Sequence, residues 1–414
     1  MKNKLLLTLC LALLMCLCSC VNTNAPSEDT NLPIQPANNI GVPLKIEFTG
    51  ASFADSLMLC TKADGNRMLS PYSAKMCLAL LANGAEGETK EEILNAIGIS
   101  DLDAYNDEVK ALLSRYESYA AALSLNTANS LWLNQSAFSG KGKFIADYRE
   151  KMVNFYSADA REVTNENSVE EVNKWANEKT NGKIKEILRE EHRNFAAVLA
   201  NAVYFKAAWK TAFSENLTAK GEFTNADGTI SITDFMHNTD TFGYYENDGI
   251  KAVKLDYSRY GDNEEYVSDE KFDFSMYFIL SDGDVRVEEF LNSAEFVNSK
   301  VRLAIPKFEL EYDISLTEIL KSLGMQKAFS DDADLSAMLE ESAKIDDVLQ
   351  KTYIKIDENG TEAAAVTAIM IKLTSAMVDD RPIKEFIADK PFSFAVKDNT
   401  SGEILFVGRY ENAK

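Results

Sequence analysis

Histidine is scarce in this sequence, which has only two, His192 and His237, among 414 residues. They lie far apart, and neither belongs to an H-E-x-x-H zinc motif. The chain also lacks a G-x-S-x-G nucleophile elbow, a complete phosphate-binding loop and a G-x-G-x-x-G dinucleotide motif. These absences exclude the common enzyme signatures, so the sequence predicts a protein that is not an enzyme and needs no metal and no cofactor.

Positively charged residues are also few: the chain has 43 Lys and Arg but 65 Asp and Glu, which gives a net charge of −22. Nonspecific nucleic-acid binding needs clustered Lys and Arg that neutralise phosphates, so no nucleic-acid partner is predicted. The acidity favours cationic partners or solubility. With 46% hydrophobic residues, the chain can bury one large core or two ordinary ones.

Four of the six cysteines lie within the first twenty residues, at positions 10, 16, 18 and 20. In this stretch two lysines precede a short apolar run, which is the pattern of a secretory signal and not of a membrane-spanning helix. The block Leu17-Cys18-Ser19-Cys20 resembles the lipobox of bacterial lipoproteins. This resemblance implies a signal peptide at 1–19 and a lipid on Cys20, and the polar residues 20–43 then read as a flexible tether.

The lipid on Cys20 predicts a protein anchored at the cell envelope, in the outer membrane, on its periplasmic or its surface side. Release to the outside is an alternative, and so is an ordinary signal peptide with chance cysteines. Only Cys60 and Cys77 remain in the body of the chain, both in apolar helical settings. Two cysteines make no disulfide framework, so we expect buried free thiols.

From Leu44 onward, helical and strand periods interleave without a second linker or an internal repeat. The pattern predicts one α+β domain over 44–414. Predicted helices cover Ala51–Thr61, Ser70–Asn83, Glu88–Ile97, Asp101–Leu123, Lys143–Phe155 and Ser168–Glu178. Predicted strands cover Ala197–Phe205, Val253–Leu255, Phe272–Leu280, Val301–Pro306, Thr352–Ile356, Pro391–Val396 and Ile404–Val407.

The segment 359–376 mixes two propensities, since its first half is small and Ala-rich and its second half is β-branched and apolar. Read with a period of two, Thr361, Ala363 and Ala365 share a face that could be buried throughout. Small side chains there would allow the segment to slide between two existing strands. A buried helix or an ordinary core strand remains the alternative at this point.

This segment, from Asn359 to Thr367, resembles the inhibitory hinge motif of the serpins, and further motifs extend the likeness from about Phe53 to Tyr410. It implies a serpin fold, with a large central mixed β-sheet, two further sheets, eight or nine helices and an exposed reactive-centre loop. The implied hinge residues are Glu358, Gly360, Thr361, Glu362, Ala363, Ala364, Ala365, Val366 and Thr367. The residues implied around the site of loop insertion are Ser70, Ser73, Asn201, Trp209 and Gln350.

One departure from the serpin pattern is Gln350, which stands where the family commonly has a histidine that hydrogen-bonds near the matches of Ser70 and Asn201. A glutamine amide both donates and accepts hydrogen bonds, so we expect a modified network. Val366 replaces a frequent alanine, but it falls on the outward face, so insertion should tolerate it.

The resemblance implies a suicide substrate: a protease cuts the loop, forms an acyl-enzyme, and is trapped when the loop inserts into the central sheet. The family's cut position, counted from the hinge glycine, corresponds to the bond Thr374–Ser375, with Leu373 and Lys372 as alternatives. Thr374 or Leu373 implies an elastase-like or chymotrypsin-like serine protease. Lys372 would admit a trypsin-like protease or a papain-like cysteine protease.

Two other functions remain open for a chain with this pattern. A non-inhibitory serpin used for binding or storage is the first alternative, although such members tend to have bulky or charged hinge residues. A lipid-anchored hydrolase is the second, and the missing nucleophile motif counts against it. We expect the inhibitor to act as a monomer.

Overall fold

The computed structural model describes residues 51–61, 65–139, 142–261, 265–362 and 381–413, which belong to one compact unit. Within these ranges it has eight α-helices: α1 (Phe53–Cys60), α2 (Pro71–Ala82), α3 (Gly87–Ile97), α4 (Leu102–Ser118), α5 (Ala146–Tyr156), α6 (Ser168–Lys179), α7 (Val287–Ser293) and α8 (Thr317–Ser322). None of these described helices is both long and apolar enough to cross a membrane.

The described strands form two sheets. The strands of the six-stranded sheet are β10 (Phe308–Ser315), β11 (Asp347–Ile356), β12 (Gly360–Thr361), β4 (Ala197–Ala208), β2 (Leu123–Asn134) and β3 (Asp159–Val163), in spatial order. The nine-stranded sheet follows the order β1 (Arg67–Leu69), β15 (Ile404–Tyr410), β14 (Phe392–Asp398), β8 (Phe274–Leu280), β7 (Ile250–Asp256), β6 (Ile230–Asn247), β9 (Val297–Pro306) and β13 (Lys384–Ile387), with β5 (Ala219–Thr224) on β6.

The six-stranded sheet is mixed, because β4 and β2 have parallel partners in β11 and β3 while the other pairings are antiparallel. This is the large central sheet of the predicted fold. The two further sheets that were expected are joined here by β6, which pairs with β9 along most of its length and with β7 at its end. The α+β class and the mixed central sheet are confirmed.

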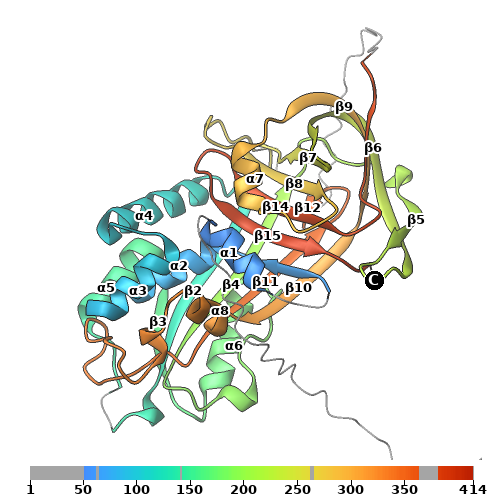
Figure 1. Cartoon of the computed structure of the whole chain (residues 1–414). Coiled ribbons are helices and arrows are strands. Elements are labelled where there is room, and N and C mark those ends of the chain that lie inside the picture. The colour runs from blue at the N-terminus through green and yellow to red at the C-terminus, as the bar shows by residue number, and fades with distance from the viewer. Residues whose placement is uncertain (1–50, 62–64, 140–141, 262–264, 363–380, 414) are drawn as a thin grey trace, which may run out of the picture. The chain divides into compact units, whose positions relative to one another are not determined.

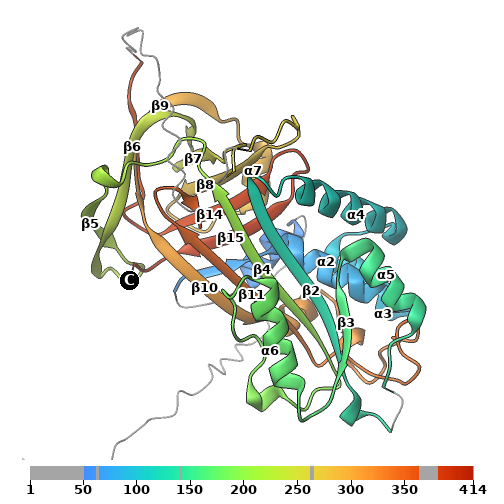
Figure 2. The ribbon, with the colours of Figure 1, turned by 180° about the vertical axis from the view of Figure 1, so that it is seen from behind.

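Both faces of the central sheet are covered, and β4 shows how the sequence achieves this. Its alternate residues Leu199 and Phe205 belong to the main core, into which α2 packs, while Val198 and Tyr204 belong to a second core with Trp175 of α6. Strand residues alternate between faces, so a strand buried on both faces reads as a nearly continuous apolar run. Figures 1 and 2 show α2 on one face of this sheet and α6 on the other.

The helix α2 runs through the interior and starts with a clear signal. Ser70 is its N-cap, whose hydroxyl accepts a hydrogen bond from the Ser73 amide at 3.3 Å, and Pro71 occupies the first turn. Nearly every residue of the helix is buried. Its N-terminus is therefore a fixed point beneath the central sheet.

The predicted helix at Asp101–Leu123 is too long. In the structure α4 ends at Ser118, and β2 begins at Leu123. The run Tyr119-Ala-Ala-Ala-Leu123 has helix-forming residues, but the Tyr119 ring packs edge-on against Phe272 at 5.2 Å and the chain turns there. Tertiary packing overrides local propensity at this point.

Neither Cys60 nor Cys77, the two cysteines of the body, is in a disulfide bond. Cys77 is fully buried, and desolvation raises the pKa of its thiol to about 12, so it is unreactive at neutral pH. Cys60 is only half-buried, which corrects the expectation that both thiols lie in the core. Cys20 lies outside the described residues.

Candidate functional site

The candidate site lies where β12 enters the central sheet between β11 and β4. Below this point β11 and β4 pair directly and in parallel along 347–353 and 198–204, a stretch that we call the seam. At the entry point itself, Thr361 pairs with both neighbouring strands and Gly360 pairs with β4. The sheet has therefore admitted two residues of the segment and is closed beneath them.

We call residues 357–362 the hinge, and its Thr361 is completely buried. The Thr361 hydroxyl is hydrogen-bonded to the hydroxyl of Tyr257 at 2.6 Å, and burial raises the pKa of Tyr257 well above its ordinary value. The Tyr257 ring stacks on Trp209, with centroids 4.8 Å apart and planes 14° apart. Only a small side chain fits at Thr361.

Trp209 holds the start of the hinge. Its indole Nε1 donates to the carbonyl of Asp357 at 2.9 Å, and its backbone amide donates to the carbonyl of Asn359 at 2.8 Å. Trp209 directly follows β4, so these two bonds fix the bend of the chain between β11 and β12.

Glu358 is held by a separate set of contacts. Its carboxylate lies 2.8 Å from the ammonium of Lys307, accepts a hydrogen bond from the Thr218 hydroxyl at 2.7 Å, and is almost completely buried. Burial alone would raise the pKa of Glu358, but the bonds from Lys307 and Thr218 hold it below the usual range. The Phe213 amide also donates to the Glu358 carbonyl.

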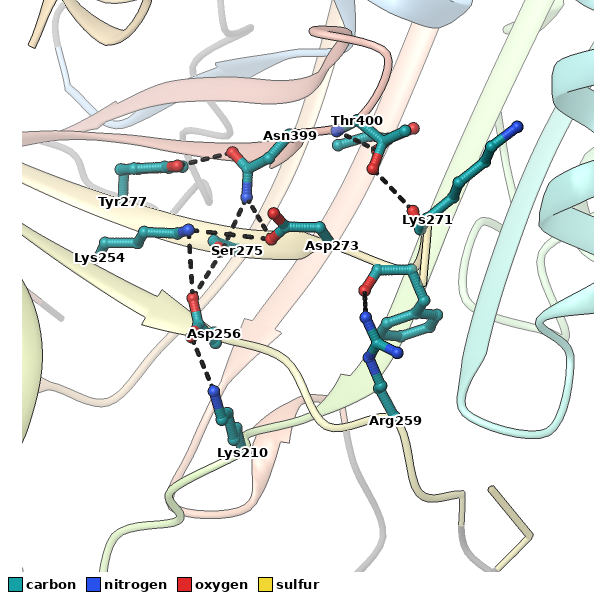
Figure 3. Close-up of polar contacts among 12 residues, drawn as sticks. Lys210, Lys254, Asp256, Arg259, Lys271, Asp273, Ser275, Tyr277, Asn399 and Thr400 are labelled. Carbon is teal, nitrogen blue, oxygen red and sulfur yellow. Dashed lines mark hydrogen bonds and ion pairs between the residues drawn. The ribbon is translucent and has the colours of Figure 1, made fainter. Parts of the chain in front are cut away.

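A polar network next to Trp209 supports this arrangement (Figure 3). Lys210 follows Trp209, and its ammonium lies 3.2 Å from the carboxylate of Asp256 at the end of β7. Asp256 also accepts a hydrogen bond from Ser275 at 3.0 Å. Burial acts to raise the pKa of Asp256, but Lys254, Lys210 and Ser275 together lower it, so the carboxylate stays charged and ties these strands together.

The seam has its own network, centred on Gln350, which is fully buried. Its side-chain oxygen accepts a hydrogen bond from the Ser70 amide at 2.9 Å. Its amide nitrogen donates to the Ser70 carbonyl at 3.0 Å and to the side-chain oxygen of Asn201 at 2.8 Å. The glutamine therefore uses both its donor and its acceptor, and the modified network that was expected is present.

Asn201 extends this network across the seam. Its amide nitrogen donates to the Ser73 hydroxyl and, at 2.6 Å, to the side-chain oxygen of Asn129 on β2. Gln350 and Asn201 face each other in the parallel register of β11 and β4. Parting these two strands must therefore break the Gln350–Asn201 hydrogen bond directly above the start of α2.

A family model described as "Serpin (serine protease inhibitor)" matches residues 51–413 of this chain. The chain belongs to the serpin family. A serpin-like protein of Thermococcus kodakarensis is 34% identical over 360 residues, which cover 85% of this chain and 82% of that protein. Serpins are protease inhibitors as a family.

Solved serpin structures share the fold. An Arabidopsis serpin, solved in its native stressed conformation, is 29% identical and superposes with a TM-score of 0.73, covering 87% of this chain and 95% of that one. A thyroxine-binding globulin solved with thyroxine superposes with a TM-score of 0.73 over 87% of this chain and 97% of its own, but at 22% identity it supports the fold alone.

The structure brings together several residues that the serpin resemblance singled out. Glu358, Gly360, Thr361 and Trp209 meet at the hinge, and Glu362 follows as its last residue. Ser70, Ser73, Asn201 and Gln350 meet at the seam. The other residues that the resemblance assigned to the hinge motif lie outside the described residues: Ala363, Ala364, Ala365, Val366 and Thr367. So do the candidates for the attacked bond, Lys372, Leu373, Thr374 and Ser375.

Sequence reasoning missed the partners that hold these residues. Tyr257 and Lys307 contact the hinge, Asn129 extends the seam network, and Lys183 pairs with Glu362. Each comes from a distant part of the chain and makes its contact through one or two atoms, so no local pattern marks it.

Proposed function

We propose that this serpin inhibits serine proteases by offering them the segment after β12 as a substrate. The observation that carries the proposal is the place of β12, which already lies between β11 and β4 while the seam below remains closed. A segment that enters at this point can extend downward only by parting the seam.

The proposed reaction starts as an ordinary proteolytic attack on the bond Thr374–Ser375. The protease's serine oxygen bonds to the carbonyl carbon of Thr374, the bond to the Ser375 nitrogen breaks, and that nitrogen leaves as an amine after taking a proton. The protease remains attached to Thr374 as an ester. The freed segment then continues β12 as a strand between β11 and β4 and carries the attached protease with it.

Strand addition supplies the driving force in this proposal. Each added residue gains hydrogen bonds to a neighbouring strand, at about 0.5–1.5 kcal/mol net per bond. Small residues follow Thr361 in the sequence, at Ala363 and Ala365, and they would meet the interior as Thr361 does. Parting the seam breaks the hydrogen bonds between β11 and β4, and the inserted strand would replace them with its own.

Thr374 as the attacked residue supports an elastase-like or chymotrypsin-like target, whereas a cut at Lys372 would give a trypsin-like or papain-like one. The second candidate function is non-inhibitory binding. Thyroxine-binding globulin, solved with thyroxine, shares the fold, but at 22% identity it gives this alternative no further support. The small buried Thr361 and the small residues after it favour the inhibitor.

The deciding experiment mixes the purified protein with elastase, chymotrypsin, trypsin and papain. An inhibitor yields a covalent band on a denaturing gel, and the mass of the released C-terminal peptide identifies the bond. Cleavage of the segment should also raise the melting temperature of the protein. Cleavage with neither a covalent band nor a higher melting temperature would assign the protein to the binding class.

We also propose that Cys20 carries a lipid that anchors the inhibitor in the outer membrane of the cell envelope. The motif Leu17-Cys18-Ser19-Cys20 supports this proposal. Cys20→Ser should move the protein from the membrane fraction to the soluble fraction, while the mass of the wild-type N-terminal peptide should include the lipid. A wild-type protein that is soluble and unmodified contradicts the anchor.

A further inference from the structure

Glu362, the residue directly after β12, has a backbone that cannot continue a strand. Its φ is 48°, in the left-handed region, which is uncommon for a residue other than glycine, Asn or Asp. Its amide still donates to the Lys355 carbonyl of β11 at 2.8 Å. β12 therefore ends at Thr361 because the chain turns at Glu362, although β11 still offers Glu362 a hydrogen-bond partner.

The Glu362 carboxylate is engaged at this turn. One oxygen forms an ion pair with the ammonium of Lys183, and the other oxygen is buried without a hydrogen-bond partner among the described residues. The Glu362 side chain is only 12% exposed. Lys183 also lies over the ring of Tyr353, 5.5 Å from its centroid. A mostly buried carboxylate thus depends on Lys183 for its neutralisation.

Lys183 is held in place by the chain around it. It follows α6 and a turn in which Asn181 and Gly182 both have positive φ values, 52° and 82°. The next residue, Ile184, is fully buried, and its amide donates to the Thr180 hydroxyl at 2.9 Å. α6 covers the face of the central sheet that is opposite α2 (Figure 2). The ammonium is therefore presented to the hinge from a fixed element.

We propose that Lys183 is a positioning residue that stops the uncut segment after two residues of strand, by holding Glu362 in its turn. This inference rests on the inhibitory function proposed above. To lengthen β12 by one residue, Glu362 must leave φ 48° for the extended region, and its carboxylate must leave Lys183. The ion pair therefore opposes the first step of insertion.

This stop has a kinetic consequence. The acyl-enzyme either is trapped by insertion or is released by hydrolysis, so the inhibitor consumed per protease, minus one, equals the ratio of the hydrolysis rate to the insertion rate. Lys183→Ala removes the ion pair and should speed insertion. For a partly exposed pair the expected change in this ratio is a decrease of about 1.5-fold to fivefold.

The test uses the full chain with chymotrypsin or elastase, whichever forms the covalent band with the wild type. A second measurement needs no protease: a synthetic peptide with the sequence of residues 361–374 is added to the uncut protein. The rate at which the peptide raises the melting temperature reports on how easily the hinge leaves its place. Lys183→Ala should increase this rate by about 1.5-fold to fivefold as well.

Three further variants separate the ion pair from a general loosening of α6. Lys183→Arg should behave like the wild type, and the exchange of Lys183→Glu with Glu362→Lys should return both measurements toward it. Lys179→Ala removes an ion pair between α6 and Asp159, 3.0 Å apart, that does not touch the hinge, so it should change neither measurement.

Equal peptide rates for the wild type and Lys183→Ala, including no uptake by either, overturn the proposal. An effect of Lys179→Ala as large as that of Lys183→Ala overturns it too, because loosening of α6 then explains the result. If the wild type forms no covalent band with any protease, the proposed inhibitory function fails, while the peptide rates still decide on Lys183.

Discussion

The hinge and the seam bind the same two strands, β4 and β11, by different means. At the hinge, Glu358 and Glu362 pair with lysines that are 38% and 36% exposed. At the seam, Gln350 and Asn201 are fully buried and use only neutral amide and hydroxyl groups. Charge is used where water is near enough to reduce its desolvation cost, and neutral hydrogen bonds are used where water is absent.

If the sheet opens as proposed, this difference explains how it can also be stable beforehand. Buried neutral bonds do not respond to pH or to moderate salt, so the seam stays closed under most conditions. The ion pairs of the hinge are screened by salt, and the pair of Glu358 also responds to acid, because the pKa of Glu358 is lowered in the folded protein. In the proposed mechanism the hinge moves first, and it is the part whose ion pairs the surroundings can influence.

The largest expected effect comes from Thr361→Arg at the hinge. A guanidinium cannot be buried in the place of a fully buried Thr361 without a large cost, so insertion should fail while the rest of the fold survives. Covalent complex formation with the target protease should fall on the order of a hundredfold or more, and the variant should be cut as a substrate.

Thr361→Ser is the matched control for this variant, because serine retains the hydroxyl that bonds to Tyr257 at 2.6 Å. It should trap the protease nearly as well as the wild type. Undiminished trapping by Thr361→Arg would show that the segment does not insert along the path proposed here.

The seam should give the next largest effect. Asn201→Ala leaves the Gln350 amide and the Asn129 oxygen without this buried partner, and should lower the free energy of unfolding by about 1–3 kcal/mol. Urea unfolding measures the change. Asn126→Ala is the control, since this amide of β2 only bonds to the Lys179 carbonyl at 3.2 Å at an exposed site. If both variants lose the same free energy of unfolding, the seam network has no special role in stability.

Gln350→His should make the stability of the seam depend on pH, which the neutral glutamine does not. A neutral imidazole can accept from the Ser70 amide and donate to a second partner, but a protonated imidazole has no acceptor left. Burial lowers the pKa of such a histidine in the folded state, so stability should fall as the pH drops below its unfolded value of about 6.5.

We expect the variant to lose about 1 kcal/mol of unfolding free energy relative to the wild type between pH 7.5 and pH 5.5. Urea unfolding at both pH values measures this, with the wild type as the reference because Gln350 does not titrate. A variant whose stability follows that of the wild type over this range would mean that the histidine is accommodated in its charged form.

Glu358→Gln is expected to have the smallest effect. The pKa of Glu358 is lowered in the folded protein, so its stabilisation is present above the unfolded pKa of about 4.3 and is lost as the pH falls through the folded value. Since Lys307 is 38% exposed, the variant should lose only about 0.5–1 kcal/mol at pH 7, and the difference should vanish by pH about 3.

Urea unfolding at the two pH values checks this, with Glu385→Gln as the control. Glu385 pairs with Arg302, but both side chains are more than half exposed, so its removal should change stability little. If Glu358→Gln still has a lower free energy of unfolding than the wild type at pH 3, the loss comes from packing and not from the charge.

The sequence predicts local elements of this protein well where one face carries a regular pattern. The predicted helices Ser70–Asn83 and Glu88–Ile97 match α2 and α3 to within a residue or so at each end. β2 and β6 were missed, because their residues are polar at many positions and become strands only through their pairing partners. Strand propensity depends on such neighbours more than helix propensity does.

The site shows the same division. Gln350 was singled out through the serpin resemblance, and Thr361 also through the small side chains of its segment. The full burial of Thr361 agrees with the face predicted for it, whereas Glu362 lies outside the strand. Tyr257, Lys307 and Lys183 could not be found in this way. Their roles follow from contacts between segments that lie far apart in the chain, and a single sequence contains no trace of those distances.

The strand order of the nine-stranded sheet also constrains how the molecule is made. β14 and β15 come late in the sequence, yet each lies between two other strands: β15 between β1 and β14, and β14 between β15 and β8 (Figure 1). During synthesis, β8 and β1 therefore have to wait with open edges until residues 392–410 have left the ribosome. This sheet can be completed only after β14 and β15 have been made.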